Sequence, residues 1–279
     1  MKCRVRNYHC MGFRYLGFRG VMRYIFKQIE KLTCNMSTDI ECVSKSNMEL
    51  GIEEKLFTRE KATVVFNGST GGIDLKKFDI VNKESWRKEV RGKYDLDEND
   101  WVYGFVGRIN RDKGINDLLE AFFLMNNNSK LLLVGEIEKN SYLDVVLLEK
   151  ARKSEKIIFA GKIEAVEKYY AAMDVLILPS YREGFGNVII EAESMGIPVI
   201  SSNIPGPQDT MEANKTGYLI ERGNIKELIE KMKRIKDISI YEDFSKNACK
   251  FAKSKFDSRI LNECILERKE LLIGERNEN

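Results

Sequence analysis

The regular alternation of apolar strands and helical segments after residue 100 constrains the fold of this chain most strongly. Runs such as LLLV and VLIL are almost continuously apolar, which is typical of strands buried on both faces of a parallel sheet. One strand follows another about every 25 to 30 residues, with a helical pattern between them, and this predicts an α/β fold with a doubly wound parallel sheet. We predict strands at 101–109, 130–136, 156–161, 174–180, 197–202 and 217–220, and helices near 114–126, 140–153, 164–172 and 186–195.

The first hundred residues follow a less regular pattern. We predict a helix at about 20–36, a short strand within 38–44, a helix from Ser44 to about 55, and a strand at 62–68. Residues 69–78 form a loop around Gly71-Gly72, and the charged stretch 82–100 is a helix followed by a linker. The acidic Asp95-x-Asp97 resembles a metal signature, but it precedes a strand instead of following one, and we interpret it as a solvated turn.

Composition limits the classes of function. The chain has 279 residues, of which 43% are hydrophobic, and this allows two domains with ample core. A net charge of +3 is too close to zero to indicate a nucleic-acid partner, and we expect none. Six scattered cysteines without a C-x-x-C pair, together with a single histidine, argue against a zinc site and fit a reducing cytoplasm. No apolar run approaches the ~20 residues of a membrane span, and residues 1–20 lack a secretory h-region.

The first 31 residues are basic and rich in aromatic side chains. Eight lysines and arginines face one acid, Glu30, and apolar residues fall at 22, 25, 26, 29 and 32 with a helical period. Such a helix can lie on an anionic membrane surface, in peripheral contact with its inner face. It can equally pack on a domain with its basic side in solvent. Both interpretations stay open at this point.

Ligands of open parallel sheets bind beyond the carboxyl ends of the strands, so the residues there are the candidates for a site. Gly107-Arg108 ends one strand, and Lys113 follows five residues after the arginine. Two cations at one strand end suit a multiply charged oxyanion such as a diphosphate. The alternative is that both are solvated loop side chains.

The segment ILPSYREGFGNVIIEAESMGIPVIS holds two carboxylates eight residues apart, Glu183 in a loop and Glu191 inside the next helix. That helix begins near Gly186-Asn187, where unpaired amides and the helix dipole favour an anion. At 100° per residue Glu191 lies over Asn187 and can accept two hydrogen bonds from vicinal hydroxyls. Glu193 falls on the other flank, which we expect to face solvent. The alternative is that both Glu183 and Glu191 are surface charges.

These segments carry a family resemblance. FVGRINRDKGINDLLEAF and LPSYREGFGNVIIEAESMGIPVISSNIPGPQD resemble the signature segments of the group 1 (family 4) retaining glycosyltransferases, which have the GT-B fold. Glu183 and Glu191 correspond to the E-x7-E motif of that family. VVFNGSTGGIDLKKF, GFRYLGFRG and CVSKSNMEL resemble N-terminal-domain segments of its bacterial capsule and exopolysaccharide members.

The resemblance implies a role for each candidate residue. Arg108 and Lys113 would hold the donor diphosphate and stabilise the departing nucleotide, and Glu183 would contact the donor sugar. Glu191 would hold the ribose hydroxyls. Gly107, Val188 and the amides around Phe185, Gly186 and Asn187 would line the donor site, with Lys162 and Ile163 beside the base. The implied donor is a nucleotide-diphosphate sugar, with a UDP-sugar as the expectation from the family, and no metal or cofactor is required.

The resemblance also implies a domain organisation. Residues 1–80 correspond to a part of the N-terminal acceptor-side domain, 81–256 to the nucleotide-sugar-binding domain, and 257–279 to a helix that packs back toward the N-terminal domain. The early strands, the glycine-rich first loop and the acceptor-side histidine of the family have no counterpart, and His9 does not take over that role. We therefore expect an N-terminally truncated enzyme, a chain completed by a separate N-terminal partner, or a true short protein.

The expected function is retaining sugar transfer to a saccharide or polyprenyl-linked acceptor in cell-surface polysaccharide biosynthesis, in the cytoplasm. The alternative is a non-catalytic nucleotide-sugar-binding subunit or an inactive fragment. A dinucleotide-binding dehydrogenase is excluded by the absence of G-x-G-x-x-G after any strand, and a P-loop enzyme by the absence of G-x-x-x-x-G-K-[ST].

Overall fold

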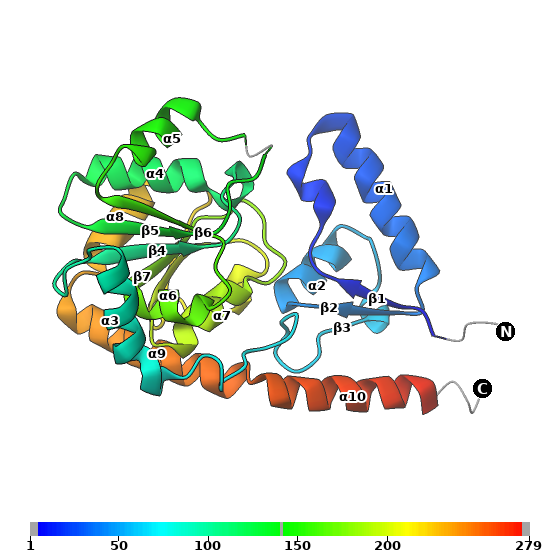
Figure 1. Cartoon of the computed structure of the whole chain (residues 1–279). Coiled ribbons are helices and arrows are strands. Elements are labelled where there is room, and N and C mark those ends of the chain that lie inside the picture. The colour runs from blue at the N-terminus through cyan, green and yellow to red at the C-terminus, as the bar shows by residue number, and fades with distance from the viewer. Residues whose placement is uncertain (1–4, 140–141, 275–279) are drawn as a thin grey trace.

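The computed structural model describes residues 5–139 and 142–274, which form a larger and a smaller parallel sheet (Figure 1). The larger sheet has the strand order β6-β5-β4-β7-β8-β9, and every pairing in it is parallel. This confirms the doubly wound α/β prediction. Its strands are β4 (Val102–Val106), β5 (Lys130–Val134), β6 (Ile157–Gly161), β7 (Val175–Leu178), β8 (Val199–Ser202) and β9 (Gly217–Ile220).

Helices cover both faces of this sheet because its strands are apolar on both sides (Figure 1). They are α3 (Lys83–Lys93), α4 (Ile115–Met125), α5 (Val145–Arg152), α6 (Val166–Ala172), α7 (Asn187–Ser194), α8 (Ile225–Arg234) and α9 (Ile238–Lys255). The chain runs outward from β4 to β6 and then returns to place β7 on the other side of β4. Such a reversal opens a crevice at the carboxyl ends of β4 and β7.

The smaller sheet consists of β1 (Asn7–Cys10), β2 (Asp39–Cys42) and β3 (Ala62–Thr63), with α1 (Gly20–Met36) and α2 (Lys45–Glu53). Ser44 caps α2 as predicted, because its hydroxyl accepts a hydrogen bond from the Asn47 amide at 3.2 Å. The predicted strand at 62–68 ends after two residues, since Phe66 and Gly68 take positive φ angles and turn the chain away. β1 was not predicted, because NYHC shows neither apolar alternation nor an apolar run.

Shorter elements and a long final helix connect the two sheets. The 3-10 turns are η1 (Arg14–Gly17), η2 (Arg59–Lys61), η3 (Ile80–Asn82), η4 (Arg111–Lys113) and η5 (Pro207–Asp209). Helix α10 (Ser258–Gly274) extends from the larger sheet to the smaller one along the bottom of the view (Figure 1). There the Arg268 guanidinium contacts Asp39 of β2 at 2.6 Å. The domain limits at 80 and 256 stay predictions.

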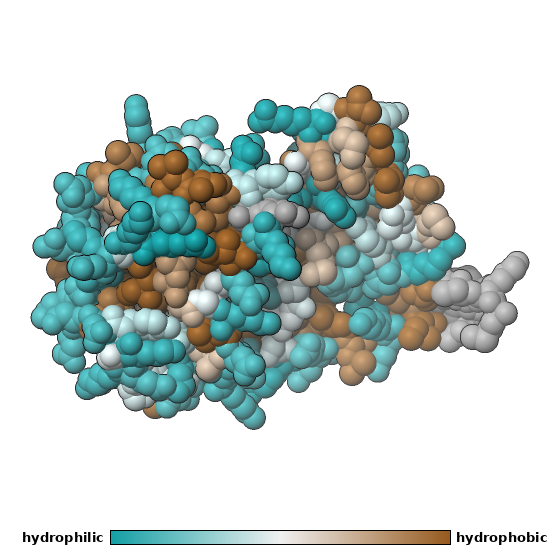
Figure 2. Space-filling view, turned by 45° about the horizontal axis from the view of Figure 1, so that its top comes forward, coloured by the Kyte–Doolittle hydropathy of each residue, from teal (hydrophilic) through white to brown (hydrophobic). Residues whose placement is uncertain are grey.

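Helix α1 lies where the sequence predicts it, but with an unexpected orientation. Its cations Arg23 and Lys27 point inward and form ion pairs with Glu54 at the end of α2. Its apolar side faces solvent, and Figure 2 shows hydrophobic side chains gathered over it at the upper right. The cations Arg23 and Lys31 are exposed, as the interpretation of a packed helix expects, but the apolar side of the helix is exposed as well, which that interpretation did not expect.

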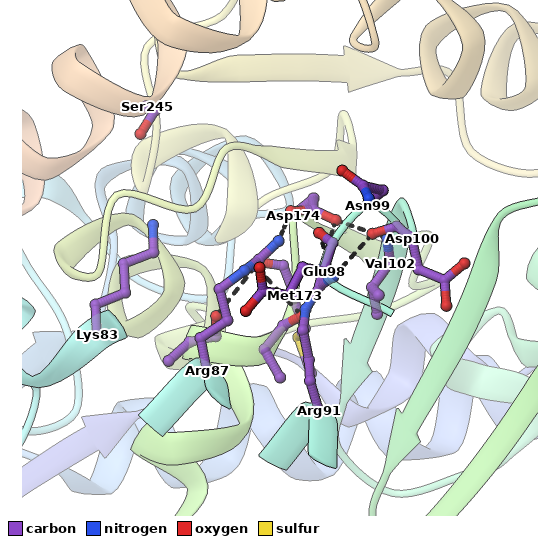
Figure 3. Close-up of polar contacts among 12 residues, drawn as sticks. Lys83, Arg87, Arg91, Glu98, Asn99, Asp100, Val102, Met173, Asp174 and Ser245 are labelled. Atoms are coloured by element: carbon purple, nitrogen blue, oxygen red, sulfur yellow. Dashed lines mark hydrogen bonds and ion pairs between the residues drawn. The ribbon is translucent and has the colours of Figure 1, made fainter. Parts of the chain in front are cut away.

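A buried cluster of charges joins α3 to the larger sheet at the amino-terminal ends of β4 and β7 (Figure 3). Asp174, at the start of β7, accepts hydrogen bonds from Arg87 at 2.7 Å and Arg91 at 3.0 Å. The same carboxylate accepts the Val102 amide at 2.7 Å and so links β4 to β7. Nearby, burial lowers the pKa of Lys83 to about 8.

Glu193 does not face solvent, and the prediction that it would is wrong. Its residue is 0% exposed, and neither carboxylate oxygen has a hydrogen-bond partner within the described part of the chain. The helical-wheel position is right, but helix α9 packs against α7, and the residue is buried inside the domain. Burial raises the pKa of Glu193 well above its ordinary value.

We expect Glu193→Gln to stabilise the fold at neutral pH. The pKa of this carboxyl is about 4.3 in the unfolded chain and higher in the folded chain. At a pH between these two values the folded chain keeps a proton that the unfolded chain releases. The free energy of unfolding of the wild type therefore falls as pH rises, by up to about 1.4 kcal/mol per pH unit. The glutamine lacks this cost. Urea unfolding at pH 4 and pH 8 measures the difference in the free energy of unfolding between the variant and the wild type. The variant should be slightly more stable at pH 4 and more clearly so at pH 8. Glu242→Gln on the exposed side of α9 is the control, and an advantage for Glu193→Gln that does not change with pH contradicts the prediction.

Candidate active site

The loops that follow β4 and β5 meet at the crevice. Gly107, which ends β4, has φ 145°, and its carbonyl oxygen would lie 1.8 Å from a Cβ at Gly135, the residue after β5. A side chain at Gly135 would therefore separate the two loops. This close approach places the Arg108 loop beside the 135–138 loop.

Lys113 and Glu183, from the segments that follow β4 and β7, contact each other. The Lys113 ammonium lies 2.5 Å from a Glu183 carboxylate oxygen, and the Ser180 hydroxyl donates to the same oxygen at 3.0 Å. Both side chains are largely buried, with exposures of 17% and 10%. Gly114, in a left-handed conformation, lets η4 approach β7, because a Cβ there would lie 2.0 Å from the Pro179 carbonyl oxygen. The structure thus brings together two residues predicted from distant segments.

Arg108 lies at the rim and is paired with a carboxylate that the sequence did not single out. Its guanidinium lies 2.5 Å from Glu138, whose second oxygen accepts a hydrogen bond from the Asn110 amide at 2.6 Å. These two donors lower the pKa of Glu138. The Arg108 side chain is 68% exposed and can turn toward a ligand. Glu138 could have been suspected because it lies three residues after Gly135, at the end of a predicted strand. A glutamate by itself does not indicate a site.

Helix α7 begins at Asn187, directly after Gly186 at φ 96°. The side-chain amide of Asn187 forms its hydrogen bonds with residues other than Glu191. Its nitrogen donates to the Thr70 hydroxyl at 2.5 Å, and its oxygen accepts from the Ser69 hydroxyl at 3.2 Å. The side chain of Phe185 is buried against Phe256, with ring centroids 5.6 Å apart, so only its backbone can face a ligand. Val188 is half-buried on the core.

Glu191 is mostly shielded within the larger domain and contacts a tyrosine from α6. The Tyr170 hydroxyl donates to its carboxylate at 2.8 Å. Burial raises the pKa of Glu191, and the tyrosine hydrogen bond opposes that shift. Tyr170 was missed by the sequence analysis because aromatic residues on an apolar helix are usually core. Of the remaining candidates, Lys162 is exposed and Ile163 partly buried, both just after β6.

The smaller sheet supplies a second wall to the site. Gly184 lies so close to the Met11-Gly12 turn that a Cβ on it would be 2.2 Å from the Met11 carbonyl oxygen. The Asn47 side chain donates to the Gly184 carbonyl at 2.5 Å. Ser46 donates to Asp209 at 2.7 Å through both its amide and its hydroxyl. The absence of a side chain at Gly184 therefore lets this loop approach the smaller sheet closely.

Among the described residues there is neither a metal-binding cluster nor a membrane-spanning helix. Across residues 5–139 and 142–274, no set of three or more histidine, cysteine, aspartate or glutamate side chains is arranged to hold a metal ion. Over the same ranges no helix combines the length and apolar character needed to cross a membrane.

The chain is similar in sequence to known proteins. Residues 87–251 match the family model described as glycosyl transferases group 1. The capsular polysaccharide biosynthesis glycosyltransferase CapM of Staphylococcus aureus is 33% identical over 264 residues, which cover 93% of this chain and 68% of CapM. An Escherichia coli UDP-Gal:alpha-D-GlcNAc-diphosphoundecaprenol alpha-1,3-galactosyltransferase is 28% identical, over 88% of this chain and 63% of that enzyme. The chain thus spans about two thirds of the length of these relatives.

Solved structures show the same fold. A sucrose-phosphate synthase from Thermosynechococcus elongatus superposes with a TM-score of 0.79 at 23% identity, over 96% of this chain and 67% of that one. HepE from Anabaena, in complex with UDP and glucose, gives a TM-score of 0.78 at 20% identity, over 95% and 71%. The family match covers more than half of the chain, and the fold agrees with the GT-B type expected for it. The chain belongs to the group 1 glycosyl transferases.

Proposed function

We propose that this chain transfers a sugar, with retention of configuration, from a nucleotide-diphosphate donor to a saccharide or lipid-linked saccharide acceptor. The proposal rests on one observation above the others: Lys113 and Glu183 are brought into contact at the carboxyl ends of β4 and β7, beside the start of α7. A cation, a carboxylate and a helix N-terminus at one point can bind a phosphate and a sugar hydroxyl together.

When the donor binds, oxygens of its diphosphate would replace the carboxylates that pair with Arg108 and Lys113. Lys113 would leave Glu183, which then accepts hydrogen bonds from the donor sugar, and Arg108 would leave Glu138. Both cations would then stabilise the charge that develops on the departing nucleotide. Attack from the face on which the phosphate leaves would retain the configuration of the sugar.

A UDP-sugar is the donor we favour, and a polyprenyl-linked saccharide is the acceptor. The support lies in the relatives: HepE has been solved with UDP and glucose, and the Escherichia coli enzyme is described as acting on a diphosphoundecaprenol-linked sugar. The reaction would take place in the cytoplasm during cell-surface polysaccharide biosynthesis. It would need no metal ion, because the cations and α7 amides hold the diphosphate, and activity should therefore persist in EDTA.

We predict that Glu191→Gln weakens UDP binding about 10- to 100-fold, because hydrogen bonds that involve a charged partner contribute about 1.5 to 3 kcal/mol. The glutamine keeps the volume and an acceptor for Tyr170, so the thermal unfolding midpoint should change little. Calorimetry with UDP measures the effect. Unchanged UDP affinity would remove the ribose-binding role of Glu191.

Calorimetry of the purified chain with UDP, GDP and ADP, beside the matching nucleosides, tests the donor site. Binding of one diphosphate with clear preference supports it, and absence of binding for all three contradicts it. Transfer is then measured with the matching nucleotide sugar and a lipid-linked saccharide, and the anomeric configuration of the product is read by NMR. Donor binding without turnover would favour the alternative of a binding subunit that needs a separate N-terminal partner.

A further inference from the structure

Helix α2 lies on the side of the smaller sheet that faces the larger one, and its first turn contacts two loops of the larger sheet (Figure 1). The side-chain nitrogen of Asn47 donates to the Ser44 hydroxyl at 2.8 Å and to the Gly184 carbonyl at 2.5 Å. Asn47 is 1% exposed, so its amide group cannot replace these bonds with bonds to water. The loop that carries Glu183 therefore depends on α2 for this hydrogen bond.

Neighbouring contacts hold Asn47 in place. The Ser46 hydroxyl donates to the Asp209 carboxylate at 2.7 Å and accepts from the Gly206 amide at 2.8 Å. The Ser46 amide donates to the same carboxylate at 2.7 Å. These bonds fix the start of α2 against the loop after β8. Asn47 cannot withdraw from Gly184 without disturbing them.

The peptide unit between Gly184 and Phe185 is closely surrounded. A Cβ on Gly184 would lie 2.2 Å from the Met11 carbonyl oxygen, and a Cβ on Gly206 would lie 2.7 Å from the Gly184 carbonyl oxygen. The Phe185 side chain is buried in the core of the larger sheet and anchors one end of this unit. Gly184 at the other end has no side chain to limit rotation. The direction of the peptide plane therefore depends on the contact between its carbonyl oxygen and Asn47.

That direction also determines where the Phe185 N–H points. The peptide bond is planar and trans, so its carbonyl and its N–H point in opposite directions. With the Gly184 carbonyl directed at α2, the Phe185 N–H is directed away from α2. This amide is one of the groups expected to line the donor site at the start of α7, where N–H groups favour an anion.

We propose that Asn47 is a positioning residue for the donor site: by holding the Gly184 carbonyl, it directs the Phe185 amide toward the donor diphosphate. The inference rests on the proposed function, because this amide matters only if a diphosphate binds beside α7. Without the Asn47 donor the peptide unit can rotate and present its carbonyl oxygen to the diphosphate, which repels it. Asn47 thus promotes donor binding without touching the donor.

Calorimetry of the full chain with UDP and with uridine tests this role. Asn47→Asp keeps the shape of the side chain and can still accept from the Ser44 hydroxyl, but its carboxylate has no hydrogen for the Gly184 carbonyl. UDP affinity should fall about 10-fold or more, the usual effect of losing a hydrogen bond to a charged group. Uridine affinity should not change, because uridine has no phosphate. Asn47→Ala lacks the donor without adding a charge and should show the same difference between UDP and uridine.

The matched control is Asn67→Asp. The Asn67 side chain also donates to a backbone carbonyl across the two parts of the chain, but its acceptor is Lys255 at the end of α9, at 3.0 Å. This variant should bind UDP and uridine like the wild type.

Unchanged UDP affinity in both Asn47 variants would overturn the inference while leaving the proposed function intact. Equal losses of UDP and uridine affinity would also overturn it, because they would indicate a general disturbance of the fold. A wild type that binds no diphosphate would contradict the proposed function, and the inference with it. That last result is obtained from the wild type alone and is therefore distinguishable from the other two.

Discussion

Asp174→Ala is expected to destabilise the fold by about 3 to 5 kcal/mol, the cost of removing one partner from a buried ion pair. The Arg91 side chain is 3% exposed and would lose its carboxylate partner, although backbone carbonyls of Ala172 and the 97–100 turn still accept from it. The Val102 amide would also lose its acceptor, so the link between β4 and the start of β7 would weaken (Figure 3).

Urea unfolding followed by circular dichroism measures this loss, and the thermal midpoint should fall on the order of 10 °C. Asp174→Asn should cost less, because its amide oxygen can still accept the Val102 amide. Glu84→Ala on the same helix is the control, since its pair with Lys88 is exposed and should contribute nothing measurable. A loss of under about 1 kcal/mol for Asp174→Ala would show that the cluster does not hold α3 to the sheet.

Lys113→Ala is expected to lower the rate of sugar transfer by about 10²- to 10³-fold, the typical cost of removing one group that stabilises developing charge. It should weaken binding of UDP but leave that of uridine unchanged, because the ammonium is proposed to contact only the diphosphate. The reason is geometric: Lys113 extends from η4 to Glu183, which holds its ammonium at 2.5 Å.

Calorimetry with UDP and uridine, together with single-turnover transfer, separates these effects. Arg111→Ala is the matched control, because Arg111 is an exposed cation on the same 3-10 turn. It should leave both binding and rate close to those of the wild type. An equal loss of UDP and uridine affinity in Lys113→Ala would contradict the diphosphate role and indicate a general disturbance of the crevice.

The larger sheet could be predicted from the sequence because each of its strands is apolar enough to be recognised alone. LLLV and VLIL need no partner to be read as buried strands, and β5 and β7 lie within the predicted ranges. β1 could not be predicted in this way. Its four residues form a strand only because β2 lies beside them, and a pairing between residues 7–10 and 39–42 is not visible in local patterns.

The site was predictable to a similar extent. Lys113 and Glu183 were singled out because their local segments are distinctive, but their contact with each other was not predicted. Glu138 and Tyr170 were not found, since each contributes through a contact made across the fold. The sequence also placed the apolar side of α1 and the flank with Glu193 by period alone. The helical period predicts the direction in which a side chain points from its helix. Whether solvent or core lies in that direction depends on the neighbouring helices and strands.

Arg108 and Lys113 are each paired with a carboxylate, so an anion that binds to either cation must compete with that carboxylate. Glu138 and Glu183 are tethered counter-ions, present at high effective concentration beside Arg108 and Lys113. A chloride or a single phosphate meets one cation at a time and must compete with a carboxylate that never diffuses away. The proposed diphosphate would engage both cations in one event, and small anions such as chloride would then be poor inhibitors of donor binding.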